Sequence, residues 1–225
     1  EIKKASIVGQ TIELFSGWEA PILGMRLILA RRNQVESECK IRMRLATTRC
    51  TNALLENSGK PPALFLTKGF PDLLNIGDQR RLGLFDLIPR KIKSFAGPCV
   101  EVEERTDRTG KVIKKPKTGE WLITAKKLTK QGHQVAVVSL LNSYLNDENE
   151  KIVLQELKNA GFSKVINSAS IHPFIKWLTR CESSVLEGYL SPILNEYLNN
   201  ITSEIGDKGE LLIMNSAGGL FTQNY

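Results

Sequence analysis

Apolar and polar residues follow two alternating patterns along this chain of 225 residues. Short runs that are almost wholly apolar predict buried strands at 63–67 and 134–141. Stretches in which apolar residues recur at helical spacing predict helices, most clearly at 146–160 and 182–205. Strands that alternate with helices favour an α/β fold with a mainly parallel central sheet.

Weaker patterns complete this predicted order of elements. Further strands are expected at 6–15, 41–45, 100–104, 111–115, 164–168 and 211–214. Further helices are expected at 20–32, 47–57, 70–76 and 120–130, and a loop is expected at 83–97. Near residue 171 the alternation gives way to one long helix, which predicts a boundary between two parts, 1–170 and 171–225.

The acidic residues form no paired-carboxylate motif, so no catalytic residue is assigned from them. Glu101, Glu103 and Glu104 fall where acidic and basic residues flank a turn, and we expect them on an exposed hairpin. Glu150 and its acidic neighbours lie in the first turn of a predicted helix, where they suit the positive end of the helix dipole.

Composition excludes several classes of protein. Hydrophobic residues make up 41% of the chain and charged residues 24%, ordinary globular values that argue against disorder. The longest nearly apolar run, 135–141, is much shorter than the ~20 residues of a membrane span. Cys39, Cys50, Cys99 and Cys181 lack the spacing of a zinc or redox motif, so we expect reduced thiols, no metal site and a cytoplasmic protein.

The formal net charge of +7 is unevenly distributed. Residues 1–132 carry 25 Lys and Arg against 14 Asp and Glu, whereas residues 133–225 carry 6 against 10. The basic clusters, such as that at 111–117, contain no aromatic residue on which a base would stack, which argues against nucleic-acid binding. Solvated surfaces are the preferred interpretation, ahead of a small anionic ligand such as a nucleotide and of nucleic acid.

One candidate phosphate site is the junction of a predicted strand and helix at 45–52. Backbone amides at a helix start, threonine hydroxyls and the Arg49 guanidinium are groups that bind an anion. Helix capping by Thr47 or Thr48 is the alternative interpretation.

A second candidate is the turn at 215–219, which follows the last predicted strand. Gly218 and Gly219 allow a ligand to approach the backbone closely, and a plain turn is the alternative. Neither segment has the spacing of a Walker loop or of a Rossmann fingerprint.

Beyond spacing, several blocks of the chain together resemble the hydantoinase A/5-oxoprolinase family. In order, they are ATTRCTNALLE at 46–56, TKGFPDLLNIG at 67–77, LFDL at 84–87, EVEER at 101–105 with GKV at 110–112, LLNSYLN at 140–146 and MNSAGGL at 214–220. Because the blocks keep the family's order over nearly the whole chain, the resemblance is specific.

The resemblance implies an actin-like ATPase fold of the ribonuclease H type and ATP-dependent opening of a cyclic amide. The substrate would be 5-oxoproline, hydantoin or N-methylhydantoin, and ATP with Mg the cofactor. Partners would be the remainder of a longer chain or a hydantoinase B-type subunit. The family residues near the phosphates correspond here to Thr47, Thr48, Thr51 and Asn52, with a second turn at Gly218 and Gly219.

The chain also departs from the family pattern. Ala46 stands in place of a glycine, and Asn142 and Asn149 stand where histidines are common. The chain begins at Glu1 and contains no DIGGT phosphate loop, so we expect a fragment that has no activity by itself. A non-catalytic binding or scaffold module that retains the fold is the alternative function.

Overall fold

A computed structural model describes residues 4–8, 11–36, 39–79, 85, 94–206 and 209–222, with only the backbone of 4–8 and 11–15. The chain forms two compact units. Unit 1 combines residues 1–57 with 192–225, and unit 2 comprises residues 58–191. Each unit contains residues from both sides of the division that the sequence predicts near residue 170, and that division stays a prediction. Within the described part of the chain, no helix combines the length and apolar character needed to cross a membrane.

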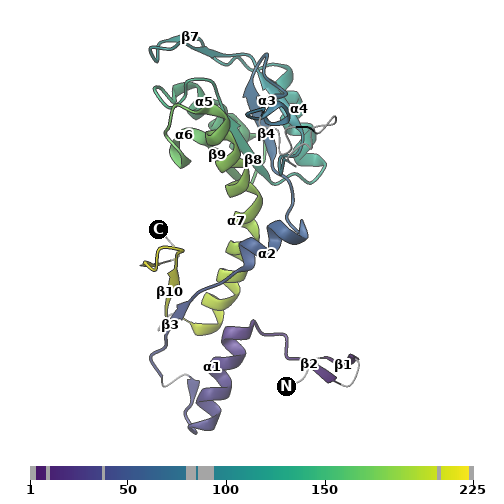
Figure 1. Cartoon of the computed structure of the whole chain (residues 1–225), viewed down its shortest axis with the longest axis vertical. Helices are drawn as coiled ribbons and strands as arrows, with labels where there is room; N and C mark the ends of the chain where they lie inside the picture. Colours follow the sequence, from purple (N-terminus) through teal and green to yellow (C-terminus); the bar gives the residue numbers. More distant parts are fainter. Residues whose placement is uncertain are drawn as a thin grey trace. The chain divides into compact units, whose positions relative to one another are not determined.

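Unit 2 is built on a parallel sheet of four strands in the order β5-β4-β8-β9 (Figure 1). Its strands are β4 (Ala63–Thr67), β5 (Cys99–Val102), β8 (Val135–Ser139) and β9 (Lys164–Asn167). Its helices are α3 (Leu73–Ile76), α4 (Glu120–Lys130), α5 (Glu148–Asn159), α6 (Ser168–Ile171) and the first part of α7 (Trp177–Ile205). This sheet confirms the α/β class predicted from the apolar runs.

Helices cover both faces of this sheet because its strands are apolar on both sides. Phe65 of β4 packs with Trp121 of α4 and Val153 of α5 on one face. Leu64 and the α7 residue Val185 pack on the other face. α7 approaches β8 closely at Gly188, where a Cβ would lie 2.9 Å from the Val137 side chain.

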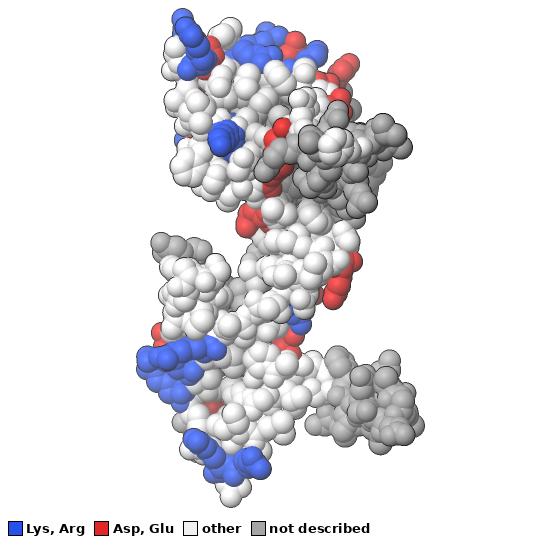
Figure 2. Space-filling model, in the orientation of Figure 1, with Lys and Arg blue, Asp and Glu red and all other residues white. Residues whose placement is uncertain are grey.

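Unit 1 contains a smaller mixed sheet in the order β11-β10-β3. Its elements are β1 (Lys4–Val8), β2 (Thr11–Phe15), α1 (Ala20–Arg31), β3 (Arg42–Leu45), α2 (Arg49–Glu56), β10 (Glu210–Met214), β11 (Leu220–Phe221) and the end of α7. β3 and β10 run parallel, and Ile22, Leu45 and Ile201 lie in the core beside them. Exposed cations gather near β3 and at the end of α1, as the blue surfaces of unit 1 show (Figure 2).

Three expectations about elements need correction. A single strand was expected at 6–15, but the chain forms two antiparallel strands there, β1 and β2. Val8 pairs with Thr11, three positions later, which is the spacing of a hairpin. Val100 and Val102 belong to the parallel sheet, not to the hairpin, because their alternate side chains enter the core. α7 begins at Trp177, five residues before its predicted start.

Two other predictions fall largely outside the described residues. The loop at 83–97 is described only at residue 85 and residues 94–97. Of the LFDL block at 84–87, Phe85 alone is described, and the basic residues at 90, 91 and 93 are not.

Candidate functional site

The two predicted phosphate segments lie at the same edge of the unit 1 sheet. β3 and β10 are adjacent and parallel, and their register pairs Leu45 with Ile213. The segment with Thr47 and Thr48 follows β3, and the turn at 215–219 follows β10. Ligands of parallel sheets bind outside the carboxyl ends of the strands, so this edge is the candidate site.

The hydroxyls at the start of α2 differ in their bonding. Thr47 Oγ1 accepts a hydrogen bond from the Arg49 amide at 3.2 Å, a local turn bond between residues i and i+2 just before α2. Thr48 occupies the N-cap position, but its side chain makes no capping bond. The side chains of Thr48, Thr51 and Asn52 are exposed, so the first turns of α2 present two hydroxyls and an amide to solvent.

Arg49 is held by other residues of unit 1. Its Nη2 donates to the Glu19 carboxylate at 2.6 Å, and its guanidinium carbon lies 4.2 Å from the centre of the Tyr197 ring. Burial raises the pKa of the Tyr197 hydroxyl, and the Glu19 charge adds to the effect, while Arg49 and a hydrogen bond with Thr47 oppose it. The Arg49 charge is therefore directed to Glu19 and Tyr197, not left free for an anion.

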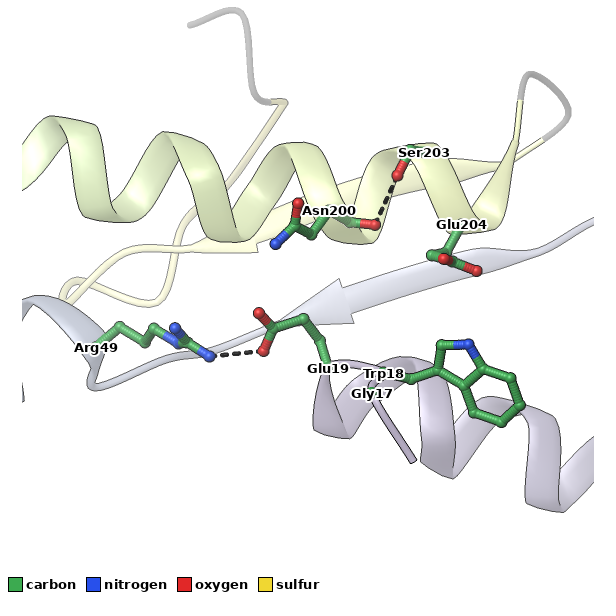
Figure 3. Close-up of a pocket in the computed structure, with 7 residues that line it drawn as sticks. All are labelled: Gly17, Trp18, Glu19, Arg49, Asn200, Ser203 and Glu204. Atoms are coloured by element: carbon green, nitrogen blue, oxygen red, sulfur yellow. Dashed lines mark hydrogen bonds and ion pairs between the residues drawn. The ribbon is translucent and has the colours of Figure 1, made fainter. Parts of the chain in front are cut away.

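A pocket of about 500 Å³ opens beside Arg49 (Figure 3). It is lined by Gly17, Trp18, Glu19, Arg49, Asn200, Ser203 and Glu204. Glu204 accepts a bond from Arg26 at 2.8 Å, and the Arg26 guanidinium also stacks on Trp18. The charged lining residues are thus paired, and none of the six predicted phosphate residues lines this pocket.

The turn at 215–219 uses its own amides. Asn215 Oδ1 accepts bonds from the Ala217 and Gly219 amides at 3.0 and 2.9 Å. The Gly218 amide donates to the Asn215 carbonyl, and the φ of +83° at Gly218 explains the glycine there. These bonds are those of the plain turn that was the alternative interpretation, and the phosphate role of Gly218 and Gly219 stays a prediction.

Two buried carboxylates in unit 2 were missed by the sequence analysis. Glu104 was expected on an exposed hairpin, but it is 3% exposed. Its carboxylate accepts bonds from Thr67 Oγ1 at 2.5 Å and Asn149 Nδ2 at 2.6 Å. The signal was the alternation of Val100, Val102 and Glu104, which places all three on the core side of the chain.

Glu150 was expected in the first turn of a helix, near the positive end of the helix dipole; it lies in the first turn of α5 and is fully buried there. Its carboxylate accepts bonds from the Leu140 and Ala169 amides at 2.9 and 3.0 Å and from Ser168 Oγ at 2.6 Å. Ser168 Oγ in turn accepts a bond from Arg180 Nε at 3.0 Å, so a hydroxyl bridges a buried charge pair. The missed signal was helical spacing, because Glu150 shares the face of the buried residues at 153 and 157.

The Glu104 carboxyl gives unit 2 a testable pH dependence. Burial raises its pKa, against smaller opposing effects of the bonds from Thr67 and Asn149. A raised pKa contributes stability that is complete below the pKa of the unfolded chain and is lost as the pH rises through the folded value. We therefore expect the urea midpoint of the chain to fall, relative to that of Glu104→Gln, between about pH 4 and neutral pH.

Glu148→Gln is the matched control, because the Glu148 side chain is 45% exposed and forms an ion pair with the exposed Lys115. The explanation fails if the wild-type midpoint stays constant or rises, relative to the Glu104→Gln midpoint, as the pH increases over this range.

Among the residues that the structure describes, no group of three or more His, Cys, Asp or Glu side chains is placed to hold a metal ion. Burial raises the pKa of the Cys181 thiol to about 12 and that of Cys99 to about 11. Both thiols are therefore protonated near neutral pH and are poor nucleophiles.

Comparisons with known proteins identify two matching family models. Residues 2–161 match the hydantoinase/oxoprolinase N-terminal region, and residues 180–225 match hydantoinase/oxoprolinase. The chain is 33% identical to 5-oxoprolinase 1 of Arabidopsis thaliana over 90% of its own length and 18% of that protein. It is 32% identical to 5-oxoprolinase of Saccharomyces cerevisiae over 79% of its length and 16% of that protein. The chain thus spans less than a fifth of these relatives.

Two solved structures have a similar fold. A nucleotide-free acetone carboxylase superposes with a TM-score of 0.74 at 24% identity, over 91% of this chain and 32% of that one. The ATP-dependent caprolactamase of Pseudomonas jessenii superposes with a TM-score of 0.71 at 20% identity, over 96% of this chain and 34% of that one. These similarities confirm the actin-like ATPase fold that the sequence resemblance implied.

Proposed function

The chain belongs to the hydantoinase/oxoprolinase family, and on this premise we propose that its parent protein is an ATP-dependent hydrolase of a cyclic amide. The proposed substrate is 5-oxoproline, hydantoin or N-methylhydantoin. Relatives named 5-oxoprolinase and a structural neighbour named ATP-dependent caprolactamase support this reaction class. Because the chain spans less than a fifth of the curated relatives, the activity is proposed for the whole protein.

The observation that carries the proposal is the parallel pairing of β3 with β10. This pairing places two segments separated by more than 160 residues at one sheet edge, and both have the composition of phosphate sites. A nucleotide site assembled from such an edge is typical of open α/β sheets.

The exposed groups of α2 fit a polyphosphate. The hydroxyls of Thr48 and Thr51 and the amide of Asn52 are exposed groups of the hydrogen-bond donor type, and the positive end of the helix dipole favours an anion. Ala46 is exposed, so its methyl group does not enter the core behind this edge. We propose that these three side chains, with Thr47, hold ATP and its Mg ion.

Bound ATP would supply the phosphoryl group that activates the amide carbonyl toward water. The contribution of this chain is to bind and orient the phosphates, since positioning and charge stabilisation supply most of the catalysis of phosphoryl transfer. Arg49 has a supporting role in this scheme, because its bond to Glu19 and its contact with Tyr197 fix the start of α2. The remainder of the parent chain, or a hydantoinase B-type subunit, would complete the cleft.

The test is ADP formation by the parent protein in the presence of 5-oxoproline or hydantoin. We expect one of these amides to stimulate ADP formation. The double variant Thr47→Ala, Thr48→Ala should lower the stimulated rate about a hundredfold, because it removes preorganised hydrogen-bond donors. The matched control is Thr124→Ala on α4, whose exposed hydroxyl bonds only within its own helix, and this variant should retain the rate.

Two outcomes would count against the proposal in different ways. An unaltered parent that turns over ATP with none of the cyclic amides would contradict the amidase function and favour a non-catalytic scaffold. Full turnover by the double variant would retain the amidase function and remove Thr47 and Thr48 from the site.

A further inference from the structure

A short hairpin in unit 2 is held by three asparagine side chains. It consists of β6 (Arg105–Thr106) and β7 (Val112–Lys114), which pair antiparallel. Asn142 Nδ2 donates to the Thr106 carbonyl at 2.9 Å, Asn146 Nδ2 to the Gly110 carbonyl at 2.9 Å, and Asn149 Nδ2 to the Lys114 carbonyl at 3.0 Å. These bonds fix both strands and the turn to the loop that follows β8 and to the first turn of α5.

The turn of this hairpin is also ordered from within. Asp107 Oδ1 accepts bonds from the Thr109 amide, the Thr109 hydroxyl and the Lys111 amide at 2.8, 2.6 and 2.9 Å. These bonds lower the pKa of Asp107, led by the bond from the Thr109 hydroxyl. The one carboxylate of the hairpin is therefore used to shape the turn.

The hairpin carries a strong positive charge. Residues 105–117 contain six Lys and Arg residues and one acidic residue. Lys114 pairs with Glu103 and Lys115 pairs with Glu148, but Arg108, Lys111 and Lys117 form no ion pair with any residue that the structure describes. Blue side chains gather at the part of unit 2 where β7 lies (Figures 1 and 2).

An exposed apolar residue lies between these cations in the sequence. Ile113, at the centre of β7, is 65% exposed. We call Arg108, Lys111, Ile113 and Lys117 the hairpin surface. Cations before and after one exposed aliphatic residue match a polypeptide in which carboxylates flank an apolar residue.

We propose that the hairpin surface binds an acidic segment of a partner protein, in which carboxylates contact Arg108 and Lys111 and an apolar residue contacts Ile113. The three asparagine bonds hold the hairpin in place before binding, which reduces the conformational entropy lost in the complex. A protein partner is favoured over nucleic acid because residues 105–117 contain no aromatic side chain for base stacking. This inference concerns unit 2 and does not rest on the proposed function.

The test uses a short fluorescein-labelled peptide that alternates glutamate and valine, titrated with the whole chain and followed by anisotropy. We expect saturable binding whose affinity falls as salt is added. The double variant Lys111→Glu, Ile113→Ser should lower this affinity about tenfold or more. The matched control is Lys126→Glu with Ile123→Ser on α4, where an exposed lysine and a 71% exposed isoleucine lie on a helix. This control should retain the affinity.

A second variant tests the role of the asparagines without changing charge. Asn142 has a φ of +59°, so Asn142→Gly keeps the backbone conformation and removes the bond to Thr106. We expect it to weaken peptide binding severalfold while the melting temperature of the chain falls only slightly. Equal weakening by the α4 control, absence of saturable binding, or tighter binding of a single-stranded oligonucleotide than of the peptide would overturn the proposal.

Discussion

Replacing Glu150 by Gln is expected to lower the free energy of unfolding of unit 2 by about 3 kcal/mol or more. The Glu150 carboxylate is the acceptor for two backbone amides and one hydroxyl. The negative charge of Glu150 is also the counter-charge of the Arg180 guanidinium, which is fully buried. A glutamine would leave this cation without a counter-charge and would direct an NH₂ group toward one of the amide donors.

The measurement is urea denaturation of the whole chain followed by circular dichroism and tryptophan fluorescence. Glu148→Gln, two residues earlier and with a side chain that is 45% exposed, is the control and should shift the unfolding free energy by no more than about 0.5 kcal/mol. Equal stability of the Glu150→Gln variant and the wild-type chain would show that the buried pair contributes nothing to folding.

Replacing Phe65 by Ala is expected to cost about 3 to 5 kcal/mol of unfolding free energy. Phe65 is fully buried in β4, and its ring makes edge contacts with Trp121 and Phe162 at centroid distances of 6.4 and 6.0 Å. Its removal leaves a cavity between the sheet and the helices α4 and α5. The same urea experiment measures this loss.

Phe65→Leu fills most of that volume, so its cost should be about 1.5 kcal/mol or less. Ile123→Ala, at a 71% exposed position of α4, should change the unfolding free energy by about 0.5 kcal/mol or less. A Phe65→Ala variant as stable as Phe65→Leu would mean that the core of unit 2 closes around the missing ring.

The two segments of the candidate site could be located from the sequence, but their proximity in space could not. Sequence reasoning located Thr47, Thr48, Gly218 and Gly219 at the ends of predicted strands, because strand ends and turns are local features. It treated the two segments as separate candidates. Their common sheet edge follows from the pairing of β3 with β10, which depends on packing between segments far apart in the chain.

The buried carboxylates show why composition misleads at such positions. A run with Glu101, Glu103 and Glu104 has the composition of a solvated hairpin, yet alternation alone separates the buried Glu104 from the exposed Glu101. Burial of a carboxylate depends on donors from other segments, here Thr67 and Asn149, and no short pattern encodes those partners.

By itself, the sequence determined the family, the α/β class and most elements of the unit 2 sheet, because apolar periodicity and ordered motifs are local properties of the chain. Only the tertiary structure decided which strands are neighbours, which carboxylates are buried and which cations are already paired. Those outcomes depend on contacts such as Glu150 with Ser168 and Arg49 with Glu19, which join residues that only folding brings together.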